Sequence, residues 1–330
     1  MIGQIDINYI RKRPSKLWNR IVSYLFFEGR PVTTKGQWIN PFVLTMLNFE
    51  KKFPLLKRIE KPIFIVGTGR SGTTVLGIVL SMHSDVGFLN EPKALWHAIF
   101  PYEDLIGSYD RGHALYRMDA SRATPEVVQA AHRLYGVYLT ATFSRRIVDK
   151  YPEQVFRVPF LRKVFPDAKF LFLVRNGWDT CYSIDQWSER LGQEHQGETH
   201  DWWGVDNRKW RFLMDQVASC DPDFKDKLSE IYSLTSHTDK AVTEWVLTMR
   251  EGSQLCREYP ESVLMVRYES LVQSPEQELV RIQNFCELAY DPKFQLYGEM
   301  TLSPGPARKP FPVHEAIREE FLSTMADLGY

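Results

Sequence analysis

The chain lacks net charge, because its 41 lysine and arginine residues are balanced by 41 aspartate and glutamate residues. A protein that mainly coats nucleic acid carries a basic excess, so we expect no nucleic-acid partner. Cysteine is also scarce. The four cysteines are widely spaced and form no C-x-x-C pair, which predicts reduced thiols and argues against a zinc site. We therefore expect no metal.

Long apolar runs are missing as well. None approaches the length that crosses a bilayer, and no charged-apolar-small signal sequence opens the chain, so we expect a cytoplasmic protein. Residues 11–27 combine basic residues with apolar residues at helical spacing. They predict a helix that packs on its own domain or on a second subunit, or one that makes a peripheral contact with an anionic membrane. The oligomeric state stays open.

The stretch 63–76 predicts an anion site. Its apolar start indicates a buried strand, glycines then break the strand, and the apolar run 75–80 indicates a helix. Such a turn points backbone N–H groups and the positive end of a helix dipole at one place, which suits a phosphate. The alternative is a junction that binds nothing. The candidate ligand-binding residues of the loop are Gly69, Arg70, Ser71, Gly72, Thr73 and Thr74.

This loop differs from the nucleoside-triphosphate loop of the P-loop proteins. Gly67 and Gly72 have the spacing of that loop, but Thr73 stands where its lysine belongs, and Arg70 is the only cation. An NTPase needs that lysine on the outer phosphates. An ATP-dependent kinase with an unusual loop is therefore a rival interpretation, and it predicts dependence on magnesium.

Other predicted strands also end in residues that carry chemistry. The strand 169–174 ends at Arg175, and Ser183 follows eight residues later, a pairing that suits a monoester phosphate. Arg175 could instead simply pair with a carboxylate. The strand within 85–92 ends in Glu91, and ligands of open α/β sheets bind at such strand ends. We therefore expect Glu91 beside the anion loop.

The order of the elements predicts the fold. Strands alternate with helices, which indicates a three-layer, P-loop-like α/β fold with a mostly parallel central sheet flanked by helices. We expect an N-terminal helical extension over 1–55, a main domain over 56–300 and a C-terminal tail over 301–330. Within the main domain, the polar stretch 188–235 is interpreted as a substrate lid.

Four segments together resemble the family of sulfotransferases that use 3′-phosphoadenosine 5′-phosphosulfate (PAPS). The loop at 67–74 resembles the family's 5′-phosphosulfate loop, and 165–177 resembles its 3′-phosphate segment, although Asn176 stands where many members have Asp. Lys150 opens a Lys-x-Pro element, and Tyr268 opens a Tyr-Glu-x-Leu element. The resemblance covers roughly residues 60–300. It is closest to the carbohydrate and tyrosylprotein branches.

The resemblance implies a role for each residue. Arg175 and Ser183 would hold the 3′-phosphate of PAPS, Tyr268 would lie near the adenosine, and Lys150 and Arg70 would meet the charge on the leaving 5′-phosphate. Glu91 would be the general base that takes the acceptor's proton, and its alternative is a carboxylate bound to Arg70 or to a helix N-terminus. His83, the rival base, is expected to be structural. The family needs no metal.

The implied reaction is in-line transfer of a sulfuryl group from PAPS to a hydroxyl acceptor, in EC class 2.8.2. A carbohydrate or glycolipid is the first expectation for the acceptor and a tyrosyl peptide the second, with small molecules as a further alternative. A non-enzymatic relative is the remaining rival, and the presence of Glu91, Arg70 and Lys150 argues against it. Ser303, Arg308 and Lys309 could add phosphate contacts from the tail.

Overall fold

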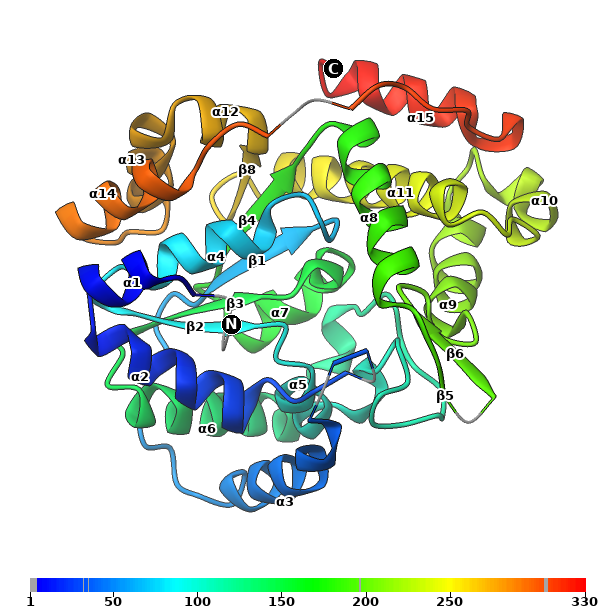
Figure 1. Cartoon of the computed structure of the whole chain (residues 1–330). Helices are drawn as coiled ribbons and strands as arrows, with labels where there is room; N and C mark the ends of the chain where they lie inside the picture. The colour runs from blue at the N-terminus through cyan, green and yellow to red at the C-terminus, as the bar shows by residue number, and fades with distance from the viewer. Residues whose placement is uncertain (1–4, 32, 35, 196, 306–307) are drawn as a thin grey trace.

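The computed structural model describes residues 5–31, 33–34, 36–195, 197–305 and 308–330. A five-stranded sheet forms its centre (Figure 1), with the strand order β2-β3-β1-β4-β8 and all four pairings parallel. The predicted α/β fold is thus confirmed. The strands are β1 (Ile63–Gly67), β2 (Val86–Asn90), β3 (Arg146–Lys150), β4 (Lys169–Val174) and β8 (Val263–Arg267).

Helices cover both faces of the sheet, because the central strand β1 is apolar on both of its sides. Ile63 and Ile65 pack into one core with α4 (Thr73–Ser81), α13 (Pro275–Phe285) and α14 (Pro292–Thr301). Phe64 and Val66 pack into a second core with α6 (Pro125–Ala141), α7 (Val158–Val164) and α11 (His237–Glu258). A strand buried on both faces is a feature of parallel sheets between helix layers.

The remaining helices connect these layers or extend them. They are α1 (Ile7–Lys12), α2 (Ser15–Val22), α3 (Asn40–Glu50), α5 (Lys93–Ile99), α8 (Gly177–Leu191), α9 (Arg208–Gln216), α10 (Leu228–Tyr232), α12 (Tyr268–Gln273) and α15 (Glu315–Asp327). A π-helical turn (Ser23–Phe27) follows α2, and 3-10 turns include Gln37–Ile39 and Pro152–Arg157. No helix in these described ranges is long and apolar enough to cross a membrane.

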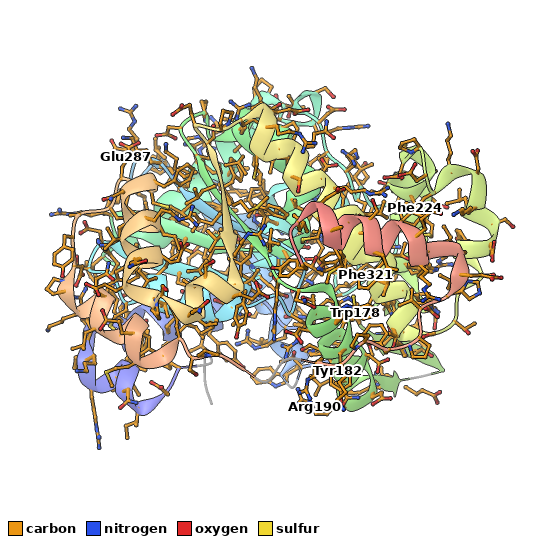
Figure 2. The ribbon with its side chains drawn as sticks, turned by 90° about the horizontal axis from the view of Figure 1, so that it is seen from above. Trp178, Tyr182, Arg190, Phe224, Glu287 and Phe321 are labelled. Atoms are coloured by element: carbon orange, nitrogen blue, oxygen red, sulfur yellow. The ribbon has the colours of Figure 1, made fainter. Side chains whose placement is uncertain are left out.

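The span 188–235 contains regular structure. It holds a small antiparallel sheet of β5 (Gln193–His195), β6 (Glu198–Asp201) and β7 (Gly204–Val205), followed by α9 and α10. The C-terminal segment ends in α15, which packs on α8. Phe321 of α15 meets the ring of Trp178 edge-on, with 4.7 Å between the ring centroids (Figure 2).

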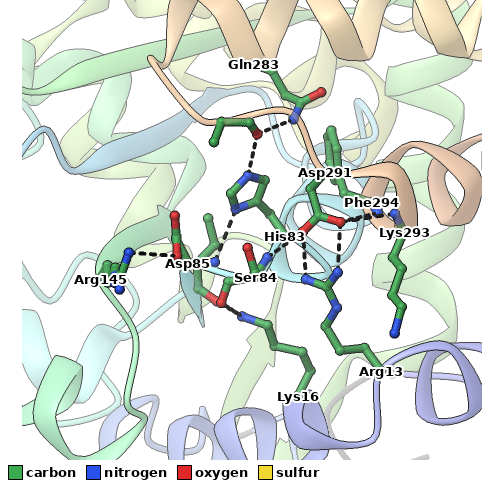
Figure 3. Close-up of polar contacts among 12 residues, drawn as sticks. Arg13, Lys16, His83, Ser84, Asp85, Arg145, Gln283, Asp291, Lys293 and Phe294 are labelled. Carbon is green, nitrogen blue, oxygen red and sulfur yellow. Dashed lines mark hydrogen bonds and ion pairs between the residues drawn. The ribbon is translucent and has the colours of Figure 1, made fainter.

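Helix α2 packs on its own domain along β2, the edge strand of the sheet. The Nζ atom of Lys16 donates to the carbonyls of Ser84 (3.0 Å) and Val86 (2.6 Å), and Arg20 donates to the carbonyl of Phe88 (2.7 Å). Figure 3 shows the Lys16 contact near the pair that Arg13 forms with Asp291.

The apolar pattern over 11–27 predicts the inward side of this helix only in part. Val22 of the apolar side is buried, but Trp18 is 53% exposed, and the charged Lys16 and Arg20 are buried as deeply as Val22. The reason is that the backbone carbonyls on the open edge of β2 would otherwise be buried without hydrogen-bond donors, and the side chains of Lys16 and Arg20 supply these donors. Lys16 and Arg20 therefore do not face lipid headgroups.

Candidate active site

Every strand of the central sheet delivers a candidate site residue at its carboxyl end. The loop 68–72 follows β1, Glu91 follows β2, Lys150 ends β3, Arg175 follows β4 and Tyr268 follows β8. Because all pairings are parallel, these ends meet at one edge of the sheet, where α/β proteins bind ligands. The structure thus brings together residues that are spread over two hundred positions of the sequence.

Two aromatic rings lie close against the glycines of the anion loop. A Cβ atom on Gly69 would stand 2.4 Å from the ring of Trp202, and a Cβ atom on Gly72 would stand 2.4 Å from the ring of Tyr268. Gly72 is the N-cap of α4 with a φ of 98°, a conformation that glycine adopts without steric cost. Only glycine therefore fits at position 69 or 72 without displacing a ring. Between them, the hydroxyl of Ser71 is buried and donates to the carbonyl of Thr68 (2.6 Å).

The two predicted phosphate sites share one cluster of cations. The Nε atom of Arg70 donates to the hydroxyl of Ser183 (3.1 Å), and Arg175 donates to the backbone carbonyl of Arg70 (3.1 Å). The guanidinium of Arg175 lies over the ring of Tyr268, 4.4 Å from its centroid. Burial, together with the charges of Arg190 and Arg175, lowers the pKa of Arg70. Repulsion within this cluster favours the binding of an anion.

Arg175 keeps hydrogen-bonding capacity for a ligand. Its Nε atom is buried without a hydrogen-bond partner, and its ion pair with Asp179 is loose, at 3.8 Å. A buried unpaired donor is unfavourable unless a ligand satisfies it. The tail reaches the same helix: the Arg308 amide donates to Asp179 (2.7 Å), and the Arg308 guanidinium lies over Tyr182. Figure 2 shows Tyr182 and Arg190 along α8.

Glu91 and Lys150 form an ion pair at the neighbouring strand ends. The ammonium of Lys150 is buried and donates to the carboxylate of Glu91, and the Nζ atom of Lys93 lies 3.8 Å from the same carboxylate. Burial alone would raise the pKa of Glu91, but the charges of Lys150 and Lys93 outweigh it and hold that pKa below its usual value. Glu91 is therefore a carboxylate at neutral pH.

The backbone is strained at two of the candidate catalytic residues. Arg70 has a φ of 69° and Glu91 a φ of 50°, values in the left-handed region that non-glycine residues seldom adopt. Strain of this kind costs about 1–3 kcal/mol and is concentrated at functional sites. Here the strain occurs at one cation of the site, Arg70, and at its candidate base, Glu91.

A pocket of about 420 Å³ opens beside Glu91 and Arg70. Part of its wall comes from residues between Arg20 and Thr34, a segment that the sequence predicts only as an extension. The buried ion pair of Arg20 with Glu28 (2.8 Å) fixes this segment, and Glu28 also accepts from the backbone amide of Asn90, next to Glu91. The contact of Glu28 with Asn90 joins positions 62 residues apart, so no local pattern in the sequence reveals it.

The opposite wall of the pocket includes Trp202, from the span 188–235. The Nε1 atom of Trp202 donates to Glu244 of α11 (2.8 Å). The ammonium of Lys209 binds both Glu244 (2.6 Å) and Glu153 (3.0 Å). Burial alone would lower the pKa of Lys209, but these two carboxylates raise it, so the lysine stays charged. The network holds Trp202 over the anion loop.

The histidines do not take part in the cation cluster. His83 is buried, its Nε2 atom lies 2.8 Å from the carbonyl of Ala289, and its Nδ1 atom accepts from the amide of Asp85 (Figure 3). The predicted structural role of His83 is therefore confirmed. His200 lines the pocket and His195 lies nearby, with 6.3 Å between the two ring centroids. Across the described part of the chain, no three His, Cys, Asp or Glu residues are grouped to hold a metal ion.

The fold and the charged strand ends define an α/β protein with a candidate anion site at one edge of its sheet. The chain belongs to the sulfotransferase family, whose model matches residues 62–225 and 210–292, most of the chain. It is therefore an enzyme of the sulfotransferase class, and the predicted family is confirmed.

The relatives that carry individual names are distant from this chain in sequence. Protein-tyrosine sulfotransferase 1 of Danio rerio is 24% identical over 242 residues, which cover 72% of this chain and 56% of the relative. Nodulation protein NoeE of Sinorhizobium fredii is 25% identical over 235 residues, 69% of this chain and 50% of the relative. The chain thus spans about half the length of these two relatives. The solved sulfotransferase domain from the curacin biosynthetic pathway is 18% identical, with a TM-score of 0.47, and the match covers 83% of this chain and 99% of that domain.

Proposed function

We propose that the enzyme transfers a sulfuryl group from PAPS to a hydroxyl group of an acceptor bound in the 420 Å³ pocket. The observation that carries this proposal is the position of the Glu91–Lys150 pair. It lies at the same sheet edge as the cation cluster and lines the same pocket as Arg70. A base, an anion site and an acceptor cavity are thus next to one another, as transfer between two bound substrates requires.

The donor would be held at the two phosphate sites. Gly69, Ser71, Gly72, Thr73 and Thr74 would surround the 5′-phosphosulfate, since the first amides of α4 have no partner within the helix. Arg175 and Ser183 would bind the 3′-phosphate. The unpaired Nε atom of Arg175 supports this assignment, and the Tyr268 ring, already beneath that guanidinium, would lie against the adenosine.

The chemistry follows from the charges of the pair. Glu91 accepts the proton of the acceptor hydroxyl while the acceptor oxygen bonds to sulfur. The bond from sulfur to the bridging oxygen breaks, and its electron pair stays on the 5′-phosphate. Lys150 and Arg70 stabilise the charge that develops there. Because Lys150 binds Glu91 in this structure, the ammonium has to leave the carboxylate, which raises the basicity of Glu91 once the donor is bound.

The acceptor class is a second part of the proposal. We infer a carbohydrate or glycolipid, because the pocket wall combines the rings of Trp187 and Trp202 with the charged groups of Arg30, Glu153 and Asp201. A wall of this kind offers both flat apolar faces and partners for several hydroxyl groups. A tyrosyl peptide is the second candidate, and the names of the tyrosine sulfotransferase relatives favour it.

The donor site is tested by calorimetric titration with 3′-phosphoadenosine 5′-phosphate (PAP), the product left by PAPS, in the presence of a chelator. We expect binding in the micromolar range, at about −8 kcal/mol. Arg175→Ala should weaken it about 100-fold, since hydrogen bonds to charged groups contribute about 1.5–3 kcal/mol each. The control Arg281→Ala removes an exposed arginine of α13 and should leave the affinity for PAP unchanged. Binding of ATP with magnesium, and not of PAP, would instead favour the kinase.

Acceptor classes are then compared by the transfer of labelled sulfate from PAPS to soluble glycosides and to tyrosyl peptides. Transfer to glycosides supports the carbohydrate assignment. Transfer to tyrosyl peptides alone would overturn that assignment and leave the donor site unaffected.

A further inference from the structure

Helix α3 has an apolar face that no part of the described chain covers. Phe42 and Phe49 lie on this face and are 59% and 61% exposed, and Trp38, in the 3-10 turn that leads into the helix, is 83% exposed. The opposite side of the helix buries Val43 and Leu47 in the main core. Seven of the eleven residues of α3 are apolar and only one is charged, a composition typical of helices that are buried or that meet a membrane.

Neighbouring segments extend this face. The ring of Phe49 meets that of Phe53 edge-on at 5.2 Å, and the chain then continues through two exposed leucines to Lys57, whose ammonium donates to the carbonyl of Ser144 (2.6 Å). Figure 1 places α2, α6 and α3 together along the lower part of the molecule. We call the "α3 face" the set of exposed side chains Trp18, Trp38, Phe42, Phe49, Leu55, Leu56 and Phe143.

Exposed cations stand close in the sequence to residues of the α3 face. Lys52 and Arg58 are exposed beside its aromatic residues, and Arg145, which follows Phe143 closely, has a side chain that is 79% exposed. Arg145 has one distant acidic partner, Asp85, at 3.9 Å. The acidic residue of α3 itself is Glu50, and burial raises its pKa to about 7, which weakens its negative charge near neutral pH. Glu60 is the exposed acidic residue next to Arg58, so the face combines exposed aromatic residues with more basic than acidic groups.

We propose that the α3 face binds the surface of a membrane that contains anionic phospholipids. Tryptophan and phenylalanine side chains enter the boundary between headgroups and acyl chains, while lysine and arginine attract anionic headgroups. A second copy of the chain fits less well, because a symmetric interface would bring the cations of the two copies toward each other.

Docking there also places the acceptor pocket near the membrane. The pocket wall at Pro31, Thr33 and Thr34 is followed within a few residues by the 3-10 turn Gln37–Ile39, which leads directly into α3. An acceptor held in a membrane could therefore reach the pocket from the side on which the protein binds. Vesicle binding does not depend on catalysis, so its failure would be distinct from a failure of the proposed sulfotransfer.

The experiment is co-sedimentation of the full chain with phosphatidylcholine vesicles, with and without phosphatidylserine. We expect binding only to the vesicles with phosphatidylserine. The variant with Trp38→Ser, Phe42→Ser and Phe49→Ser should lose it. Lys52→Glu with Arg58→Glu should weaken it at least tenfold, since each basic residue near such a surface contributes about 1 kcal/mol.

The matched control changes exposed apolar residues elsewhere. Leu296→Ser with Met300→Ser alters α14, and it should bind vesicles like the wild type. PAP binding and thermal unfolding report whether each variant is folded. The proposal is overturned if the wild type ignores anionic vesicles or if the triple variant still binds them. A dimer in solution that the triple variant loses would assign the face to a second copy and overturn it as well.

Discussion

Replacing Glu91 with glutamine removes the carboxylate that faces Lys150 and keeps the size of the side chain. General base catalysis contributes about 10²–10⁴-fold to a rate, so kcat of Glu91→Gln should fall by about that factor. PAP should bind as before or slightly more tightly, because Lys150 no longer pairs with a carboxylate. The rate of PAP release from PAPS in the presence of acceptor measures the first effect, and calorimetry measures the second.

The effect on stability should be small. A hydrogen bond between charged groups contributes about 1.5–3 kcal/mol to stability. Because 40% of the Glu91 side chain is exposed, water screens the pair, and glutamine can still accept from Lys150. The free energy of unfolding should therefore fall by only about 1 kcal/mol. The kinetic loss would thus greatly exceed any loss of folded protein.

Glu287→Gln is the matched control. Glu287, which Figure 2 labels, also has a left-handed φ, 51°, and also pairs with a lysine. That lysine is Lys61, which precedes the amino end of β1. It therefore reproduces the loss of a strained, paired glutamate at the opposite edge of the sheet. If kcat of Glu91→Gln matches that of Glu287→Gln, Glu91 is not the base.

Two further predictions concern residues next to the site. Burial raises the pKa of Asp149 to about 7, above its value in the unfolded chain, so the free energy of unfolding should fall as the pH rises from about 4 to about 7. Asp149→Asn should remove this fall and stabilise the protein by about 2–4 kcal/mol at about pH 8. Thermal melts of the wild type and the variant across pH test this. The prediction is refuted if the melting temperatures of the two proteins change with pH in the same way. Gly69→Ala should displace the ring of Trp202 and weaken PAP binding, because its Cβ atom would stand 2.4 Å from that ring, whereas the Cβ atom of Gly305→Ala meets nothing within 4 Å. Equal PAP affinity in both alanine variants would contradict the close contact.

The core of the fold could be predicted because its signals are local. The apolar block that becomes β1 and the one that becomes β4 each stand directly before a change to glycine or to a charged residue. Parallel strands then place their carboxyl ends together, so the proximity of Glu91 to Arg70 follows from topology alone. The ion pair of Glu91 with Lys150 could not be predicted, because it depends on β2 and β3 being neighbours in the sheet, an order that the sequence does not reveal.

The walls of the pocket could not be predicted in the same way. Arg20 and Glu28 lie on a segment whose apolar periodicity does not predict that these charged residues are buried. Arg20 is held there by Glu28 and by the carbonyl of Phe88, 68 residues away. Trp202 reaches Gly69 through a network that ends on Glu244. Hydrophobic periodicity reports which residues avoid water, but it does not report which backbone groups lack a partner.

The contacts of α2 with β2 also have a consequence for the protein's tendency to aggregate. The open side of an edge strand is a template on which another chain can add a strand, and lysine is one of the devices that prevents this. Here Lys16 and Arg20 occupy the carbonyls of three alternate positions, Ser84, Val86 and Phe88. A version trimmed to 62–292, the span that the family model matches, would expose that template and should aggregate through edge-to-edge pairing. The N-terminal segment thus acts as a guard against β-aggregation as well as forming part of the pocket.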